Sequence, residues 1–214
     1  MASNRPANQD DVSMDDRMSD LPPTARRLVE AARRLLARDG FGGLTVEAVA
    51  AESGEYRDSI RYYFGGKSGL VAAVVDSLAH DQSLEALRKT REVPAGESRI
   101  AALVEGDRRM AEDTAGYRDF YEILPHALKD AELCGRVAEL YDWYRDLYVR
   151  GLGDGGVGVA RAELDRYAAL MAAMIDGLAL QKALDPGGVD LQSFFALWDE
   201  ILRATLGRRL GWET

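Results

Sequence analysis

The chain has 214 residues but hardly any cysteine or histidine: Cys134 is its one cysteine, and His80 and His126 are its two histidines. A single cysteine excludes an internal disulfide framework, and so few ligands argue against a structural zinc site. Long apolar runs are missing too, because the longest, at residues 167–175, is far short of the about 20 residues of a membrane span. The N-terminus, MASNRPANQD, has no apolar signal core. We therefore expect a cytoplasmic protein with no membrane attachment, no metal and no other cofactor.

An excess of positive charge is also missing. The formal net charge is −9, which argues against a uniformly basic surface for nucleic acid. The charge is uneven, with −3 in residues 1–20, +1 in residues 21–80 and −7 in residues 81–214. A segment that meets a polyanion is expected to be depleted of acid in this way. The alternative reading is chance, and so small a difference decides nothing alone.

Prolines are few, six in all, which leaves most of the chain free to form helices. Apolar residues recur at helical spacing, and no stretch alternates long enough for a convincing strand. We predict an all-α fold with a disordered tail (1–20), a small helical unit (21–80) that docks on a larger body, and that helical body (81–214). Thr24 is the expected cap of the first helix, and the glycine run at 151–158 is an expected loop. The expected helices are 24–39, 45–52, 56–63, 67 to about 78, 97–113, 117–128, 130–151, 162–184 and 190–209.

The most informative stretch is residues 45–70, TVEAVAAESGEYRDSIRYYFGGKSGL. A helix-turn-helix needs a small residue where its helices cross, a glycine at the turn and an apolar residue that fills the angle between the helices. Ala50, Gly54 and Ile60 supply these three features at suitable spacing. The pattern therefore predicts a helix-turn-helix within residues 21–80.

The second of these helices presents groups suited to DNA. Arginine can donate two hydrogen bonds to guanine in the major groove, whereas tyrosine, serine and lysine suit phosphate oxygens. The alternative is that the Tyr-Tyr-Phe cluster belongs to the core, which we favour for Phe64 and for part of Tyr63. The candidate DNA-binding residues are Thr45, Arg57, Asp58, Ser59, Arg61, Tyr62, Tyr63 and Lys67.

Residues 24–80 resemble the DNA-binding domain of the TetR family of bacterial transcriptional regulators. The resemblance is carried by Gly40-Phe41, by Leu44-Thr45-Val46, by Ala50 and Gly54, and above all by Ile60-Arg61-Tyr62-Tyr63-Phe64 with Lys67 and Leu70. It implies that all the candidate positions except Asp58 contact operator DNA. It also implies that residues 81–214 form a helical domain for ligand binding and dimerisation.

Three positions depart from the family pattern. Glu55 stands where valine is usual, Tyr56 where a capping serine is usual, and Asp58 where a small residue is usual. A carboxylate facing phosphates is repelled, although within the groove it can accept a hydrogen bond from cytosine N4. The departures leave the operator sequence and the affinity open, without disturbing the positions that form the fold.

The last two helices are candidates for a dimer interface. Residues 162–184 carry one apolar stripe, and residues 190–209 are apolar over a wider face. Two copies would pair as a four-helix bundle, as a reader of palindromic half-sites requires; the alternative is that both stripes are intramolecular core. The first stripe is Leu164, Ala168, Met171, Ile175 and Leu178, and the second face is Leu191, Phe194, Phe195, Trp198, Ile201, Leu202 and Leu206.

A pocket for a small-molecule effector is expected among the aromatic residues of 117–148, because aromatic and methionine side chains line adaptable pockets. Ordinary core packing is the alternative for any one of them. Asp176 and His126 are the candidate buried polar groups, and an apolar or aromatic effector is expected. The candidate effector-binding residues are Met110, Tyr117, Phe120, Tyr121, Trp143, Tyr144, Met171 and Met174.

These features favour a dimeric, ligand-responsive DNA-binding regulator, which we expect to be a repressor released from a palindromic operator by an inducer. The first rival is a small-molecule or protein-binding module of the same fold that has lost DNA binding. An all-α enzyme is the second, but no catalytic constellation is visible. Gly151, Gly153 and Gly156 match a dinucleotide-binding spacing, yet no strand precedes them, so we predict no such site.

Overall fold

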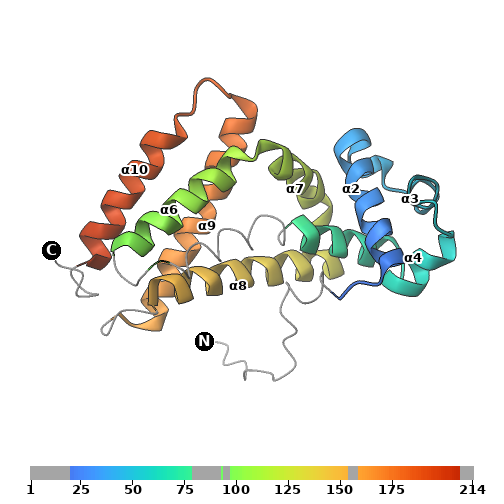
Figure 1. Ribbon diagram of the computed structural model, residues 1–214, viewed down its shortest axis with the longest axis horizontal. Coiled ribbons are helices and arrows are strands. Elements are labelled where there is room, and N and C mark those ends of the chain that lie inside the picture. Colours follow the sequence, from blue (N-terminus) through green and yellow to red (C-terminus); the bar gives the residue numbers. More distant parts are fainter. Residues whose placement is uncertain (1–19, 79–92, 94–96, 154–158, 208–214) are drawn as a thin grey trace.

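The computed structural model describes residues 20–78, 93, 97–153 and 159–207. Within these ranges the chain is helical and has no strand, which confirms the all-α prediction (Figure 1). The tail predicted for 1–20 lies outside the described residues apart from Asp20, as does the predicted boundary at 80/81. Residues 67–78 form a helix, and the others are α2 (Pro23–Gly43), α3 (Val46–Ser53), α4 (Arg57–Phe64), α6 (Glu97–Glu112), α7 (Thr114–Ala127), α8 (Ala131–Gly153), α9 (Arg161–Leu184), α10 (Leu191–Leu202) and the π-helical turn η1 (Arg203–Gly207).

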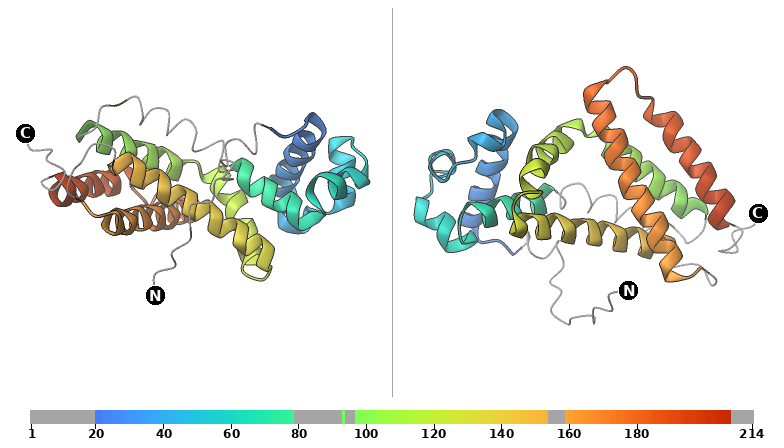
Figure 2. Two further views of the ribbon diagram at one scale, coloured as in Figure 1. Left: turned by 90° about the horizontal axis from the view of Figure 1, so that it is seen from below. Right: turned by 180° about the vertical axis from the view of Figure 1, so that it is seen from behind.

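The helices form two groups joined by α7 and α8. Helices α2, α3 and α4 lie together at one end of the molecule, and α6, α9 and α10 lie at the other (Figures 1 and 2). The long helix α8 extends between the two groups, and α7 lies against α2. A conformational change in α7 or α8 can therefore affect both groups of helices.

The α3–α4 unit has the features expected of a helix-turn-helix. Ala50 and Ile60 are buried where the helices meet. Gly54 ends α3 with φ 73° and ψ 12°, a left-handed conformation that glycine adopts without the strain that a Cβ atom brings. All three predicted roles are confirmed.

Two predicted helix starts are wrong. Helix α2 begins at Pro23, which suits the first helical position because it needs no N–H partner there. Thr24 therefore does not cap the helix; its hydroxyl accepts from Arg27 Nη2 at 3.0 Å instead. Helix α7 begins at Thr114, within the predicted break at 114–116, because Asp113 caps it by accepting from the Gly116 N–H at 3.1 Å.

Two predicted helix ends also differ. The last α-helix ends at Leu202 and passes into η1 instead of continuing to residue 209. Helix α8 includes Gly151 and Gly153, which were expected in a loop, while Gly156 lies outside the described residues. A Cβ atom on Gly151 would lie 3.2 Å from the Leu103 methyl carbons. This glycine therefore lets α6 approach α8 closely.

Two apolar cores share α7 and α8. One core joins the α2–α4 unit and the 67–78 helix to Ile123 of α7 and to Leu133 and Leu140 of α8. The other joins α6, α9, α10 and η1 to Tyr117 of α7 and Tyr148 of α8. The small N-terminal unit thus packs on the larger body, as its size led us to expect.

Helix α9 is long and apolar enough to cross a membrane by length and composition, although a third of the relevant stretch is buried inside the protein. It packs along α8, α6 and α7. The stripe predicted for the dimer interface, Leu164 to Leu178, faces this core, so the intramolecular alternative is correct for α9.

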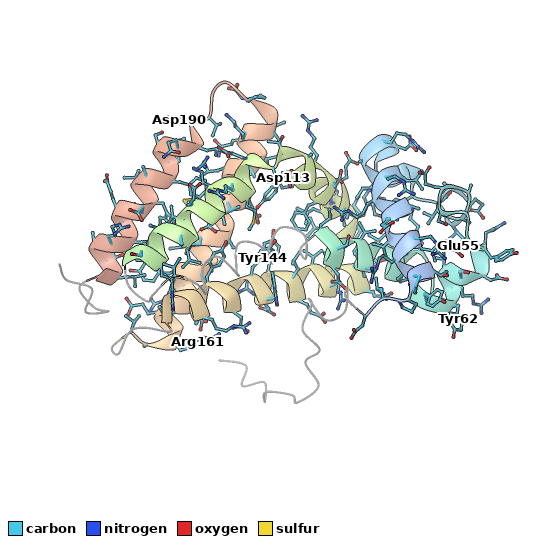
Figure 3. All side chains as sticks on the ribbon, in the orientation of Figure 1. Glu55, Tyr62, Asp113, Tyr144, Arg161 and Asp190 are labelled. Atoms are coloured by element: carbon cyan, nitrogen blue, oxygen red, sulfur yellow. The ribbon has the colours of Figure 1, made fainter. Side chains whose placement is uncertain are left out.

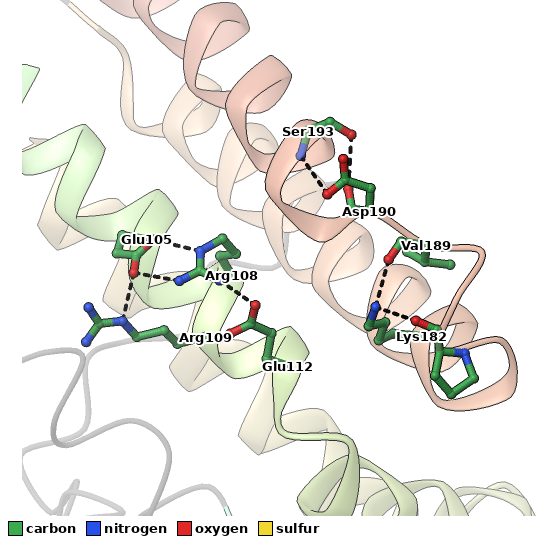
Figure 4. A network of polar contacts seen from close by, with 9 residues as sticks. Glu105, Arg108, Arg109, Glu112, Lys182, Val189, Asp190 and Ser193 are labelled. Carbon is green, nitrogen blue, oxygen red and sulfur yellow. Dashed lines mark hydrogen bonds and ion pairs between the residues drawn. The ribbon is translucent and has the colours of Figure 1, made fainter.

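Figure 4 shows polar contacts within α6 and in the loop between α9 and α10. Lys182 Nζ donates to the carbonyl oxygens of Pro186 at 2.6 Å and Val189 at 2.9 Å, which holds the loop between α9 and α10. On α6, the hydrogen bonds from Arg108 lower the pKa of Glu105 to about 2.

Candidate functional site

The face of the α3–α4 unit begins at Thr45. Its hydroxyl accepts from the Ala48 N–H at 3.1 Å and caps α3, so this exposed side chain and the first turn of α3 lie together at the surface. Between α3 and α4 lies a wide, open hollow of about 1000 Å³, whose lining includes Glu47, Arg57 and Arg61. This hollow is thus an open surface groove on this face.

Helix α4 has one buried side and one exposed side. Ile60 is buried and Phe64 is half-buried against the core, while Tyr62 is 81% exposed. Tyr63, at 37% exposed, packs edge-on against Tyr62 with ring centres 4.8 Å apart. Figure 3 shows Tyr62 at the outer end of the unit. Of the other candidates on α4, Ser59 is half-buried and the exposed residues are Arg57, Asp58 and Arg61.

Ion pairs set the positions of several charged groups on this unit. Glu55, which departs from the family pattern, accepts from Arg27 Nε of α2 at 2.6 Å, and its side chain is only 16% exposed. Glu47 of α3 pairs with Arg57 of α4. Glu55 therefore neutralises Arg27 of α2, and the sequence did not reveal this role because the two residues are 28 positions apart.

Lys67 lies at the start of the 67–78 helix and is half-buried. Its ammonium is 4.7 Å from the centre of the Phe41 ring, a cation–π distance. The contribution of Lys67 to phosphate binding stays a prediction, since the structure shows this ammonium against Phe41.

A small cavity lies where α7, α8, α9 and the 67–78 helix meet. Its volume is about 30 Å³, enough for one or two water molecules. Three of the eight predicted effector-binding residues line it, namely Tyr117, Phe120 and Tyr144. Figure 3 shows Tyr144 on the side of α8 that faces α6 and α7. The remaining lining residues are Leu78, Gly116, Leu140, Tyr141 and Asp176.

Asp176 is the polar centre of this cavity. Tyr141 Oη donates to its carboxylate at 2.6 Å, and the Tyr117 hydroxyl also bonds to it. Tyr121 Oη donates to the Asp176 backbone carbonyl at 2.6 Å. Burial raises the pKa of Asp176 although both phenol hydrogen bonds lower it. We call Asp176 with Tyr117, Tyr121 and Tyr141 the tyrosine cluster.

The other predicted effector-binding residues lie beside the cavity rather than in its lining. Met110 and Met171 are buried in the α6–α9 core, and Met174 packs against it. Trp143 packs against the N-terminal core. Tyr141 and Leu140 were left out of the predicted set although they precede Tyr144 by one helical turn, a spacing that places all three on one side of α8.

The described residues contain no group of three acidic, cysteine or histidine side chains that could hold a metal ion. The two candidate sites are an exposed helical face and an aromatic cavity that contains a half-buried carboxyl.

Two sequence profiles match the two parts of the chain. Residues 28–74 match the profile described as bacterial regulatory proteins of the tetR family, and residues 108–207 match the C-terminal profile of BetI-type transcriptional repressors. The chain belongs to the TetR family. Regulators of the TetR family bind DNA and small-molecule effectors, so this protein is a ligand-responsive DNA-binding transcriptional regulator.

Known transcriptional regulators are similar to this chain over most of its length. The regulator BetI 1 of Chromohalobacter salexigens is 29% identical over 192 residues, covering 87% of this chain and 92% of the relative. A crystal structure of a transcriptional regulator from Pseudomonas aeruginosa PAO1 has a TM-score of 0.66 at 25% identity, covering 92% of this chain and all of that one. A regulator from Saccharomonospora viridis in complex with choline has a TM-score of 0.64 at 19% identity, covering 85% and 96%.

Proposed function

We propose that this TetR-family protein is a homodimeric repressor that binds a palindromic operator through α4 and is released by a small organic cation. The exposed face of α4, anchored by buried Ile60 and bearing Arg61 and Tyr62, carries the DNA-binding part of the proposal. Arginine reads guanine in the major groove, and Thr45 at the start of α3 suits a phosphate.

The dimer interface proposed here is the outer surface of α9 and α10. On α9 an exposed stripe follows heptad spacing, and small residues at Ala173 and Gly177 permit close approach. On α10 a second stripe has the same spacing. Six of these residues are large and exposed: Leu170, Leu180 and Leu184 on α9, and Phe194, Leu197 and Ile201 on α10. Two copies of these stripes would form a four-helix bundle, which places two α4 helices on one operator.

The tyrosine cluster supports an organic cation as effector, in place of the apolar or aromatic compound that the sequence led us to expect. Aromatic faces attract quaternary ammonium groups, and a buried carboxylate is stabilised by a bound cation. The choline complex of the Saccharomonospora viridis regulator points the same way. Pockets for small molecules usually have about 300–1,000 Å³. The cavity of about 30 Å³ therefore widens on binding, by rotation of its tyrosine side chains.

The 67–78 helix supplies the route from effector to DNA. Leu78 near one end lines the cavity, and Lys67 at the other end adjoins the α4 face. Asp76 forms an ion pair with Arg136 of α8, which ties the helix to the body. When the cavity widens, this helix shifts and changes the separation of the two α4 helices, so they no longer match successive major grooves about 34 Å apart.

The proposal includes a cytoplasmic protein with no membrane attachment and no catalytic activity. Its rival is a binding module of the same fold that has lost DNA binding. A gel shift of the purified protein on the DNA upstream of its own gene separates the two. The repressor is expected to retard this DNA and to release it when choline is added, whereas no retardation at low salt supports the rival.

A further inference from the structure

The geometry of α4 points to Asp58 as a residue that reads a cytosine in each operator half-site, an inference that rests on the proposed DNA-binding function. Residues of an α-helix are separated by about 100° around its axis. Asp58 and Tyr62 therefore each lie about 160° from Ile60, on either side of the direction opposite to it. Since Ile60 is buried, these two side chains mark the outward centre of α4.

Two charged neighbours of Asp58 are each engaged in an ion pair of their own. Arg57 is held by Glu47 of α3. Glu55, the other acidic departure, is held by Arg27 of α2 and is mostly buried. Asp58 is exposed, and the described part of the chain offers it no ion pair or hydrogen bond. It is thus the acidic group on α4 that remains available to a ligand.

The chemistry of an ionised carboxylate selects its base. It only accepts hydrogen bonds, so phosphates repel it and guanine, with N7 and O6 acceptors, offers it no donor. Adenine has a donor at N6 but an acceptor beside it at N7. Cytosine presents the N4 amino group without an acceptor on the same base edge, which makes it the matching partner. A carboxylate at the outward centre of α4 therefore lowers the affinity for DNA of any sequence and favours sites with a cytosine at the matching position.

The test starts with selection from duplexes that carry two inverted, randomised half-sites. The wild-type protein is expected to select one invariant cytosine per half-site, and its replacement by each other base is expected to lower affinity about tenfold. Asp58→Ala is expected to bind all four bases there within about twofold, to keep its other preferences and to bind random DNA more tightly than the wild type. Asp58→Asn is expected to prefer adenine at that position, because an amide pairs with N6 and N7.

Asp142→Asn is the control, since it removes an exposed carboxylate on α8, outside the α3–α4 unit. It is expected to keep the wild-type preference. A cytosine preference that survives in Asp58→Ala, or a wild-type selection without an invariant cytosine, overturns the role of Asp58 alone. A wild-type protein that selects no duplex overturns the proposed DNA binding and this inference with it.

Discussion

The Phe41 ring stacks on the imidazole of His126, with ring centres 3.7 Å apart and planes 10° from parallel. Glu122, one turn earlier on α7, accepts from the Phe41 N–H at 3.4 Å. Phe41 lies near the end of α2, and α7 also carries Tyr117 and Phe120 into the cavity. This contact joins the proposed effector site to the DNA-binding unit without passing through the 67–78 helix.

We expect His126→Ala to weaken the coupling between effector and operator. DNA affinity without effector should stay within about threefold of the wild type, because His126 lies on α7, outside the α3–α4 unit that carries the proposed DNA-binding residues. The loss of DNA affinity on adding choline should fall from tenfold or more to less than threefold, in line with typical coupling free energies of about 1–3 kcal/mol. Fluorescence anisotropy with and without choline measures both quantities. Lys129→Ala, which changes an exposed residue in the turn after α7, is the control. A wild-type response in His126→Ala would refute the role of the stack.

Asp176→Asn is expected to lower choline affinity tenfold or more while leaving the cavity shape unchanged. Because burial raises the pKa of Asp176, more of the carboxyl is neutral near neutral pH than in water. Choline binding by the wild type should therefore strengthen as the pH rises through this raised pKa and weaken as the pH falls. Isothermal titration calorimetry at several pH values tests this, and a pH-dependent gain that persists in Asp176→Asn speaks against the assignment.

Asp107 of α6 predicts a pH-dependent stability. Burial raises its pKa to about 8, although the Tyr148 hydroxyl donates to it at 2.7 Å and lowers the pKa. The unfolded chain releases this proton near pH 4, so the stability due to Asp107 is full below that pH and is lost as the pH rises towards 8. Urea unfolding of Asp107→Asn should show a smaller loss of stability between pH 5 and 8, by a few kcal/mol. An equal change in the free energy of unfolding with pH for both proteins would contradict this account.

Phe194→Glu combined with Leu197→Glu is expected to give a folded monomer. Both side chains are about half exposed on α10, whereas Phe195 between them is buried and stays unchanged. Charges at two positions of the outer stripe would be buried without partners in a dimer, which is strongly unfavourable. Sedimentation velocity measures the mass, and circular dichroism checks the fold. A dimer of unchanged stability would place the interface elsewhere.

The sequence was sufficient for the fold and for the helix-turn-helix unit because both depend on local spacing. Apolar residues at helical spacing located the helices, and Ala50, Gly54 and Ile60 located the turn. The errors at Thr24 and at 114–116 were also local, since Pro23 and Asp113, each directly before the stated position, mark the observed helix starts.

The tyrosine cluster was only partly predictable, because its members come from three helices. Tyr117, Tyr141 and Asp176 are separated by up to 59 residues, and helical spacing does not show which of them meet. The outward stripes of α9 and α10 were obscured in a similar way. The sequence pattern selected the more apolar stripe of α9, and that stripe fills the core of the chain itself.

The central claim, that α4 enters DNA, is tested most directly by anisotropy titrations of the selected duplex from about 50 to 300 mM salt. The account predicts tight binding that weakens steeply with salt, as release of counterions from phosphates requires. It further predicts that Arg61→Ala binds about tenfold more weakly, whereas Arg145→Ala on α8 binds as the wild type does. Equal affinity of Arg61→Ala and the wild type at every salt concentration would contradict the claim.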